Sequence, residues 1–153
     1  MKFNNEKLLT GGIIFFLLIA IFNLPIFLLQ QKLEERKSDA EKIEESSNEL
    51  ITQSNEVIVL FNDFLEQKSK KEEVDSKLKE FQESFLETEI LENKFLDKEW
   101  KSFIEENKKF IEFMSESIEN EEIDEVQKKR LEKIFSSIIY KRQILERRIN
   151  SII

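Results

Sequence analysis

The sequence predicts an all-α protein in which a single N-terminal transmembrane helix is followed by an up-down antiparallel helical bundle. Three observations predict this fold. Residues 8–29 form a run of 22 residues without a charge. Beyond that run, apolar residues recur at three- and four-residue steps, which is the spacing of one face of a helix. Both glycines and the only proline lie before residue 26, so the rest of the chain lacks the usual helix breakers.

Residues 8–29 predict a membrane-spanning helix, because at 1.5 Å per residue they cover roughly 33 Å, enough to cross the hydrocarbon core of a bilayer. The alternative is a helix buried in a large soluble protein. The remaining residues, about 120 and strongly polar, are too few to surround such a helix. The run is too long for the apolar part of a signal peptide, and residues 28–31 offer no small-residue cleavage site. We therefore expect an uncleaved signal anchor whose partner is the lipid bilayer.

The expected organisation is a short tail at residues 1–7, the anchor at 8–29, a polar helical stalk at 30–49 and the bundle at 50–153. Two arguments about orientation oppose each other. Basic residues just after the anchor slightly outnumber those before it, which favours a cytoplasmic body. A short tail before a long domain is instead usual for an anchor whose N-terminus is cytoplasmic. We favour the second orientation, in the cell membrane, with the body extracytoplasmic.

Residues 30–68 contain no helix breaker and carry one apolar stripe, which is thin before residue 50 and richer after it. Its members are Leu33, Ala40, Ile43, Leu50, Val57, Phe61 and Phe64, with Arg36, Ser47 and Ser54 as polar members. This pattern predicts a helix that continues from the anchor and ends within residues 66–71. Ser69, followed by Glu72, matches a capping box and predicts the start of the next helix.

The next stripe comprises Val74, Leu78, Phe81 and Phe85. On the same helical phase, Glu89 and Glu92 point toward the core. Burying unpaired carboxylates is costly, so we expect a break near residues 88–93 and four helices in total. If the helix continued through both carboxylates, three long helices would result. Beyond the break the stripe resumes with Phe95, Leu96, Trp100, Phe103, Phe110, Met114 and Ile118.

Asn120, with Glu121 and Glu122 after it, predicts the cap and acidic first turn of a last helix. The apolar residues of that helix are Ile123, Leu131, Ile134, Phe135, Ile138, Leu145, Ile149 and Ile152. In a four-helix up-down bundle this helix returns toward the anchor, and its apolar end could cover the thin stripe of the stalk. Nine phenylalanines after residue 50 favour a globular bundle over a two-stranded rod.

Charge is unevenly placed along the chain, whose formal net charge is −8. Residues 32–127 carry 29 acidic and 14 basic residues, whereas residues 128–153 carry eight basic and two acidic ones. An acidic body repels phosphate groups, so we expect no nucleic-acid partner. We expect the basic segment to pair with acidic helices inside the bundle.

Catalytic and metal-binding chemistry has few candidates. The chain has no cysteine and no histidine, which excludes disulfides, thiol nucleophiles and the usual zinc sites. Adjacent glutamates point about 100° apart on a helix and form no catalytic dyad. These pairs are Glu34–Glu35, Glu44–Glu45, Glu105–Glu106 and Glu121–Glu122. We predict a protein that is not an enzyme, with no catalytic, cofactor-binding or metal-binding residues and no cofactor.

Two other groups of side chains could have a functional role. Trp100 and Tyr140 could line a ligand pocket between helices, although core packing with a polar group at the surface is the commoner role. Glu89, Glu92 and Arg142 interrupt apolar stripes and could form a buried charged layer or sit at the rim of the bundle. We favour packing for the first pair and the rim for the three charged residues.

In architecture the chain resembles the membrane-anchored four-helix-bundle sensor domains of chemotaxis-type receptors. The resemblance covers the whole chain: Lys7-Leu8-Leu9 opens the span, the first helix continues from the anchor, and three amphipathic helices follow. Such receptors have a second membrane span and a signalling region, which are not found up to Ile153, so signalling across the membrane would need a partner. No ligand residue can be carried over from the family.

Two functions are compatible with these features. The first is a single-pass, membrane-anchored interaction or sensing module that binds a partner protein or a small ligand. The second is a structural strut or scaffold of a membrane or envelope assembly, which acts through homo-oligomers or complexes. An elongated, dimeric body would favour the second function over the first.

Overall fold

The computed structural model describes residues 5–91, 96–121 and 123–152, and within these ranges the side chains from residue 24 onward. The described residues form four helices and no strand, which confirms the all-α prediction. The helices are α1 (Asn5–Leu65), α2 (Lys71–Glu89), α3 (Asp97–Asn120) and α4 (Glu125–Ile149). The chain divides into two compact units, residues 1–38 and 39–153, and α1 contributes residues to both.

The first unit contains the predicted anchor. The backbone of residues 8–29 is helical throughout, but the side chains of residues 8–23 lie outside the described ones. Five large apolar side chains at the described end of the run are exposed: Leu24, Ile26, Phe27, Leu28 and Leu29. None of the helices, as far as the described residues show, has a stretch both long and apolar enough to cross a membrane. The transmembrane span therefore stays a prediction.

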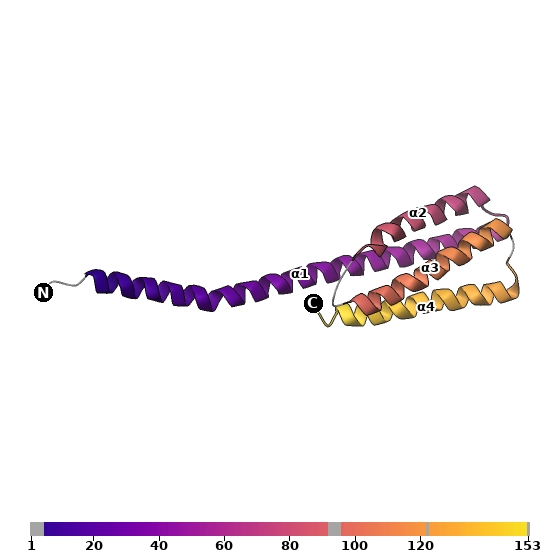
Figure 1. Ribbon diagram of the computed structural model, residues 1–153. Helices are drawn as coiled ribbons and strands as arrows, with labels where there is room; N and C mark the ends of the chain where they lie inside the picture. The colour runs from indigo at the N-terminus through magenta and orange to yellow at the C-terminus, as the bar shows by residue number, and fades with distance from the viewer. Residues whose placement is uncertain (1–4, 92–95, 122, 153) are drawn as a thin grey trace. The chain divides into compact units, whose positions relative to one another are not determined.

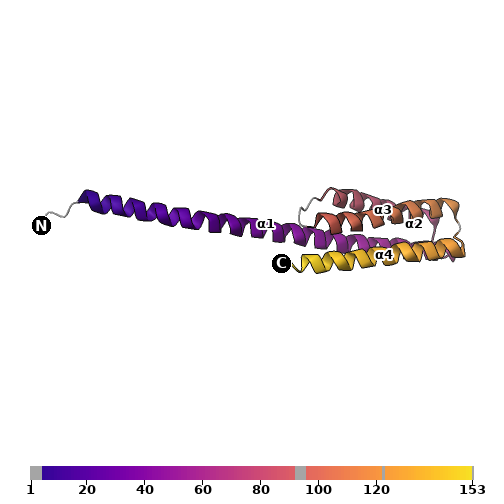
Figure 2. The ribbon, with the colours of Figure 1, turned by 60° about the horizontal axis from the view of Figure 1, so that its bottom comes forward.

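The second unit is a bundle formed by α2, α3, α4 and the part of α1 from residue 39 onward (Figure 1). Polar and cation–π contacts join α1 to α2, α2 to α3, α3 to α4 and α4 back to α1. Lys71 pairs with Glu121 and Glu89 pairs with Lys108, so α2 and α3 run antiparallel. Figure 2 shows the same bundle from another side, with α4 along its lower edge and α3 above it.

The break between α2 and α3 decides the number of helices. α2 ends at Glu89 and α3 begins at Asp97, so the alternative of three long helices is wrong. Ile90 follows α2 with its side chain exposed, and the amide of Leu91 donates to the carbonyl of Thr88 at 3.1 Å. Two residues named for this region, Glu92 and Phe95, lie outside the described residues.

The core is one apolar seam in which each helix contributes a side chain at alternating three- and four-residue steps. Its buried members on α1 are Ala40, Ile43, Ser47, Leu50, Ser54, Val57 and Phe61. On the other helices they include Val74, Leu78, Phe81, Phe85, Trp100, Phe103, Phe110, Met114, Leu131, Ile138, Leu145 and Ile149. The hydroxyls of Ser47 and Ser54 each donate to the carbonyl three residues earlier, so both buried hydroxyls have a hydrogen-bond partner within α1.

The buried part of α1 begins nearer the N-terminus than the expected boundary at residue 50. Ala40 and Ile43 are buried in the same apolar cluster as Leu145 and Ile149 of α4. Leu33, which we expected the last helix to cover, is exposed. The compact bundle accordingly starts at residue 39 and includes about half of the segment that we expected to be a stalk.

Two predicted helix caps are wrong. Ser69 does not cap α2, because its hydroxyl donates to the carbonyl of Leu60 at 3.1 Å. The residue directly before α2 is Lys70, whose side chain makes no capping hydrogen bond. Asn120 is the last residue of α3 and does not cap α4. Asp124 caps α4: its carboxylate accepts from the Gln127 amide at 2.7 Å, and the Gln127 side chain accepts from the Asp124 amide at 2.9 Å.

Two connections between helices use a left-handed residue although the bundle contains no glycine. Gln67 after α1 has φ 59° and Glu121 after α3 has φ 56°. Around Gln67, the Lys68 amide donates to the Asp63 carbonyl at 2.7 Å, and the Gln67 amide donates to Phe64 at 2.9 Å. This pattern is a Schellman motif, in which glycine is the preferred residue at the left-handed position. Both positions therefore carry steric strain that a glycine would relieve.

We predict that Gln67→Gly raises the free energy of unfolding by about 0.5–1 kcal/mol, since relief of the left-handed strain exceeds the added entropy of the unfolded chain. Urea unfolding of the full chain in mild detergent measures this change. Lys68→Gly is the matched control, because Lys68 has no positive φ and the substitution should destabilise. Equal losses of stability in both variants would contradict the assignment.

Candidate functional surfaces

Trp100 and Tyr140 do not form the ligand pocket that the sequence left open. Trp100 is buried in the core, where its ring stacks on Phe103 with centroids 5.7 Å apart. Tyr140 lies on α4 with 58% of its surface exposed. The indole Nε1 of Trp100 has no hydrogen-bond partner among the described residues. Trp100 is therefore a packing residue, and Tyr140 belongs to the outer surface of the bundle.

The three charged residues considered for a buried layer also separate. Glu92 lies outside the described residues. Glu89 forms an ion pair with Lys108 at the surface between α2 and α3. Arg142 is buried on α4, where its partners come from α1 and from its own helix. Glu89 and Arg142 thus have different partners and share no layer.

Arg142 is the buried charge of the bundle's α1–α4 interface. Its Nε and Nη2 donate to Oδ1 of Asn48 at 3.2 and 2.7 Å. The nearest carboxylates are Glu146 at 3.6 Å and Glu44 at 3.9 Å, both beyond ordinary hydrogen-bond length. A buried guanidinium is costly unless it is paired, so Asn48 supplies most of its compensation. Sequence reasoning missed Asn48, although its place next to Ser47 in the seam is a signal.

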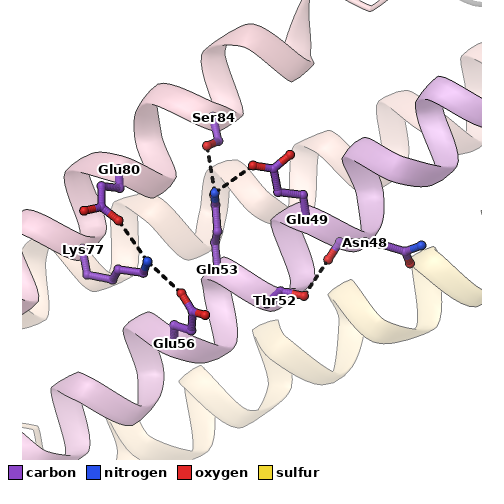
Figure 3. A network of polar contacts seen from close by, with 8 residues as sticks. All are labelled: Asn48, Glu49, Thr52, Gln53, Glu56, Lys77, Glu80 and Ser84. Atoms are coloured by element: carbon purple, nitrogen blue, oxygen red, sulfur yellow. Dashed lines mark hydrogen bonds and ion pairs between the residues drawn. The ribbon is translucent and has the colours of Figure 1, made fainter.

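A polar network joins α1 to α2 (Figure 3). Gln53 Nε2 donates to Ser84 Oγ at 2.9 Å. Lys77 Nζ lies 2.7 Å from Glu56 of α1 and 2.9 Å from Glu80 of its own helix. Hydrogen bonds to these two carboxylates raise the pKa of Lys77 above its usual value. The lysine stays charged near neutral pH, so this network holds two helices together and supplies no base.

Glu106 occupies the corresponding place between α3 and α4. Burial alone would raise the pKa of Glu106, but hydrogen bonds from Lys109 and from the Ser137 hydroxyl outweigh it and lower the pKa below its usual value. The Lys109 bond is 2.7 Å long. A carboxyl that is ionised throughout the neutral range cannot act as a general acid there, so Glu106 is a structural residue.

An apolar groove of about 330 Å³ lies between α2 and α3. It is lined by the apolar side chains Phe85, Leu86 and Ile111 and by the polar side chains Gln82, Glu89, Lys108 and Glu112. Leu86 is 61% exposed at this groove, and Ile90 at the end of α2 is 77% exposed. Where side chains are described, no acidic cluster is arranged to hold a metal ion. The groove suits an apolar side chain flanked by charge.

The outer surface of α4 is the second candidate. This helix carries eight basic and three acidic residues. The basic face of α4 consists of the exposed residues Val126, Lys129, Arg130, Lys133, Tyr140 and Arg147. Four residues of this face are spaced by seven and therefore lie along one line of the helix: Val126, Lys133, Tyr140 and Arg147. Arg130 lies over the Phe113 ring, with its guanidinium carbon 5.4 Å from the centroid.

Internal pairing, which we expected for the basic segment, holds for only part of it. Arg142 faces Glu44 of α1, and Lys128 pairs with Glu125 on the same helix. Lys129, Lys133 and Arg147 form no ion pair with any described residue. The charges of these three residues are therefore not neutralised within the described part of the bundle.

Comparison with known proteins returns no matching family model, no matching curated protein and no matching solved structure. The resemblance to receptor sensor domains therefore stays a prediction.

We predict opposite effects for the two partners of the α1–α4 contact. Asn48→Ala should lower the free energy of unfolding by about 2 kcal/mol, because it leaves the buried guanidinium of Arg142 without its hydrogen bonds. Arg142→Met should be neutral or slightly stabilising, since it removes the buried charge and leaves only the exposed Asn48 behind. Urea unfolding of both variants measures the difference. Similar decreases in the free energy of unfolding in the two variants would contradict this prediction, because they would show that contacts other than Asn48 stabilise Arg142.

Proposed function

We propose that the protein is a single-pass, membrane-anchored helical bundle that acts as a non-catalytic interaction module. Residues 8–29 are the tether, and the α2–α3 groove and the basic face of α4 are the surfaces offered to a protein partner. The observation that carries the proposal is the uncharged run of 22 residues, which lies within one continuous helix.

The tether is supported by length, composition and exposure. A helix of this length reaches across the hydrocarbon core, and every backbone amide and carbonyl in such a helix can be satisfied within it. At the described end of the run, residues 24 and 26–29 expose their apolar side chains. Exposed apolar residues in sequence suit a lipid environment, because in water each would cost free energy.

The interaction role is supported by what the bundle offers on its surface. The groove combines Phe85, Leu86 and Ile111 with a charged border, which is the composition of a docking site for a helix or a side chain. The ionisable groups described above have structural partners: Lys77 and Glu106 join helices, and Arg142 binds Asn48. Binding is therefore better supported than catalysis.

A second candidate function is a structural scaffold that works by self-association at the membrane. The observation that favours it is the separation of charge between helices: α4 is basic, whereas α2 carries seven acidic and three basic residues. Complementary faces on one molecule are what lateral assembly of identical copies requires. The two candidates agree if the module's partner is another copy.

We further propose that the N-terminus is cytoplasmic and the bundle extracytoplasmic. A C-terminal fusion of the full chain to a reporter enzyme that is active only outside the cytoplasm should then be active. Phe16→Arg with Ile19→Arg should abolish that activity, because each arginine at the centre of a span costs about 3 kcal/mol of insertion free energy.

Asn4→Arg with Asn5→Arg is the matched control, since it adds the same charge just before the span and should leave the reporter active. A second C-terminal fusion, to a reporter enzyme that is active only in the cytoplasm, tests the opposite orientation. Activity of that reporter on the chain without substitutions would contradict the proposed orientation. Equal reporter activity in the two double-arginine variants would contradict the proposal that residues 8–29 are a tether.

A further inference from the structure

We propose that the basic face of α4 binds the outer surface of α2 in a second copy of this chain. This inference deepens the proposed function, on which it rests, by naming the partner of the module. The acidic face of α2 consists of the exposed residues Glu80, Glu83, Leu86, Glu87 and Ile90.

Charge complementarity within the chain selects this partner. α4 has an excess of five basic residues, whereas α2 has an excess of four acidic ones. Glu83 and Glu87 form no ion pair with any described residue, as is also true of Lys129 and Lys133 on α4. Each face therefore carries exposed charge that the bundle does not neutralise, and the two charges are opposite.

The spacing of charge and apolar surface also matches between the two faces. On α4, Lys133 is followed seven residues later by Tyr140, and on α2, Glu83 is followed seven residues later by Ile90. Both steps cover about 10.5 Å along a helix. Parallel helices can therefore pair Lys133 with Glu83 and, at the same time, place the Tyr140 ring against Ile90.

The topology of the bundle provides the parallel direction. Since α1, α2, α3 and α4 alternate in direction, α2 and α4 point the same way within one copy. Two copies that stand side by side with the same orientation therefore bring α4 of one against α2 of the next in parallel. Tyr140 can then reach the apolar groove beside Leu86, which opens on the same side of α2 as part of the acidic face.

α2 and α4 lie on opposite sides of the bundle (Figure 1), since each of them contacts both α1 and α3. The two faces are the exposed residues of these two helices. A copy that uses its α4 face for one neighbour keeps its α2 face free for another. Such a contact is heterologous, so it continues into rings or chains and does not stop at a dimer. Because its ion pairs are exposed, the association should weaken as salt rises.

The absence of cysteine makes the contact testable by disulfide trapping. Full chains carrying Ser136→Cys and full chains carrying Leu86→Cys are mixed in mild detergent and oxidised. In the proposed register these two positions face each other, so the mixed dimer should form about tenfold more than a control mixture of Ser136→Cys with Val59→Cys. Val59 is a matched control, since it is 52% exposed but lies on α1. Equal trapping in both mixtures overturns the proposal.

A charge exchange separates loss of the contact from loss of folding. Lys133→Glu in the Ser136→Cys chain should reduce trapping about tenfold, and adding Glu83→Lys to the Leu86→Cys chain should restore it. Failure of the paired reversal to restore trapping overturns the proposal.

A membrane surface is the competing occupant of the basic face. Binding of the basic face to a membrane surface is measured by flotation of the full chain with vesicles of phosphatidylserine and phosphatidylcholine. If Lys133→Glu weakens the attraction to the anionic vesicles but leaves trapping unchanged, the lipid surface is the partner and the proposal is wrong. Trapping in detergent does not depend on the anchor crossing a membrane, so failure of the tether and failure of this contact give different results.

Discussion

The bundle depends on one buried apolar seam to which all four helices contribute at alternating three- and four-residue steps. Small residues on α1 (Ala40, Ser47 and Ser54) share this seam with large rings, and Phe81 of α2 meets Phe110 of α3 edge to face with centroids 5.6 Å apart. Burial of each such ring contributes roughly 2–3 kcal/mol, so the seam outweighs any single surface ion pair. Because the seam carries the fold, the outer faces are free to differ in charge.

The sequence was informative wherever hydrophobic spacing decides structure. The stripe of α1 was predicted with its serines. The break expected near residues 88–93 was also predicted, since α2 ends at Glu89, although the Glu89 carboxylate is paired with Lys108 at the surface. The predicted caps failed where tertiary contacts compete: the Ser69 hydroxyl reaches Leu60 of α1 and not its own helix. Asp124 and Gln127 carried a readable capping pattern that was overlooked. The contact of Arg142 with Asn48 joins residues far apart in sequence and needed the folded bundle.

Surface properties follow from the same division between seam and outer face. The basic segment was expected to pair inside the bundle, but among its described charged residues only Arg142 is buried. Lys129, Lys133 and Arg147 lie on the outer side of α4, where no acidic residue of a neighbouring helix reaches them among the described residues. A chain with three acidic helices and one basic helix thus presents two unlike surfaces. The α2–α3 groove adds apolar surface to the acidic one, and this combination is the basis of the contact proposed for α2.

The proposed tether is the central claim, because it would hold a small helical bundle at a membrane surface. It is tested most directly by partition of the full chain and of residues 39–153 between membranes and supernatant after an alkaline wash. The full chain should remain in the membrane fraction, since a span of 22 uncharged residues is not extracted by charge repulsion. The shorter chain should appear in the supernatant. Recovery of the full chain in the supernatant would contradict the account.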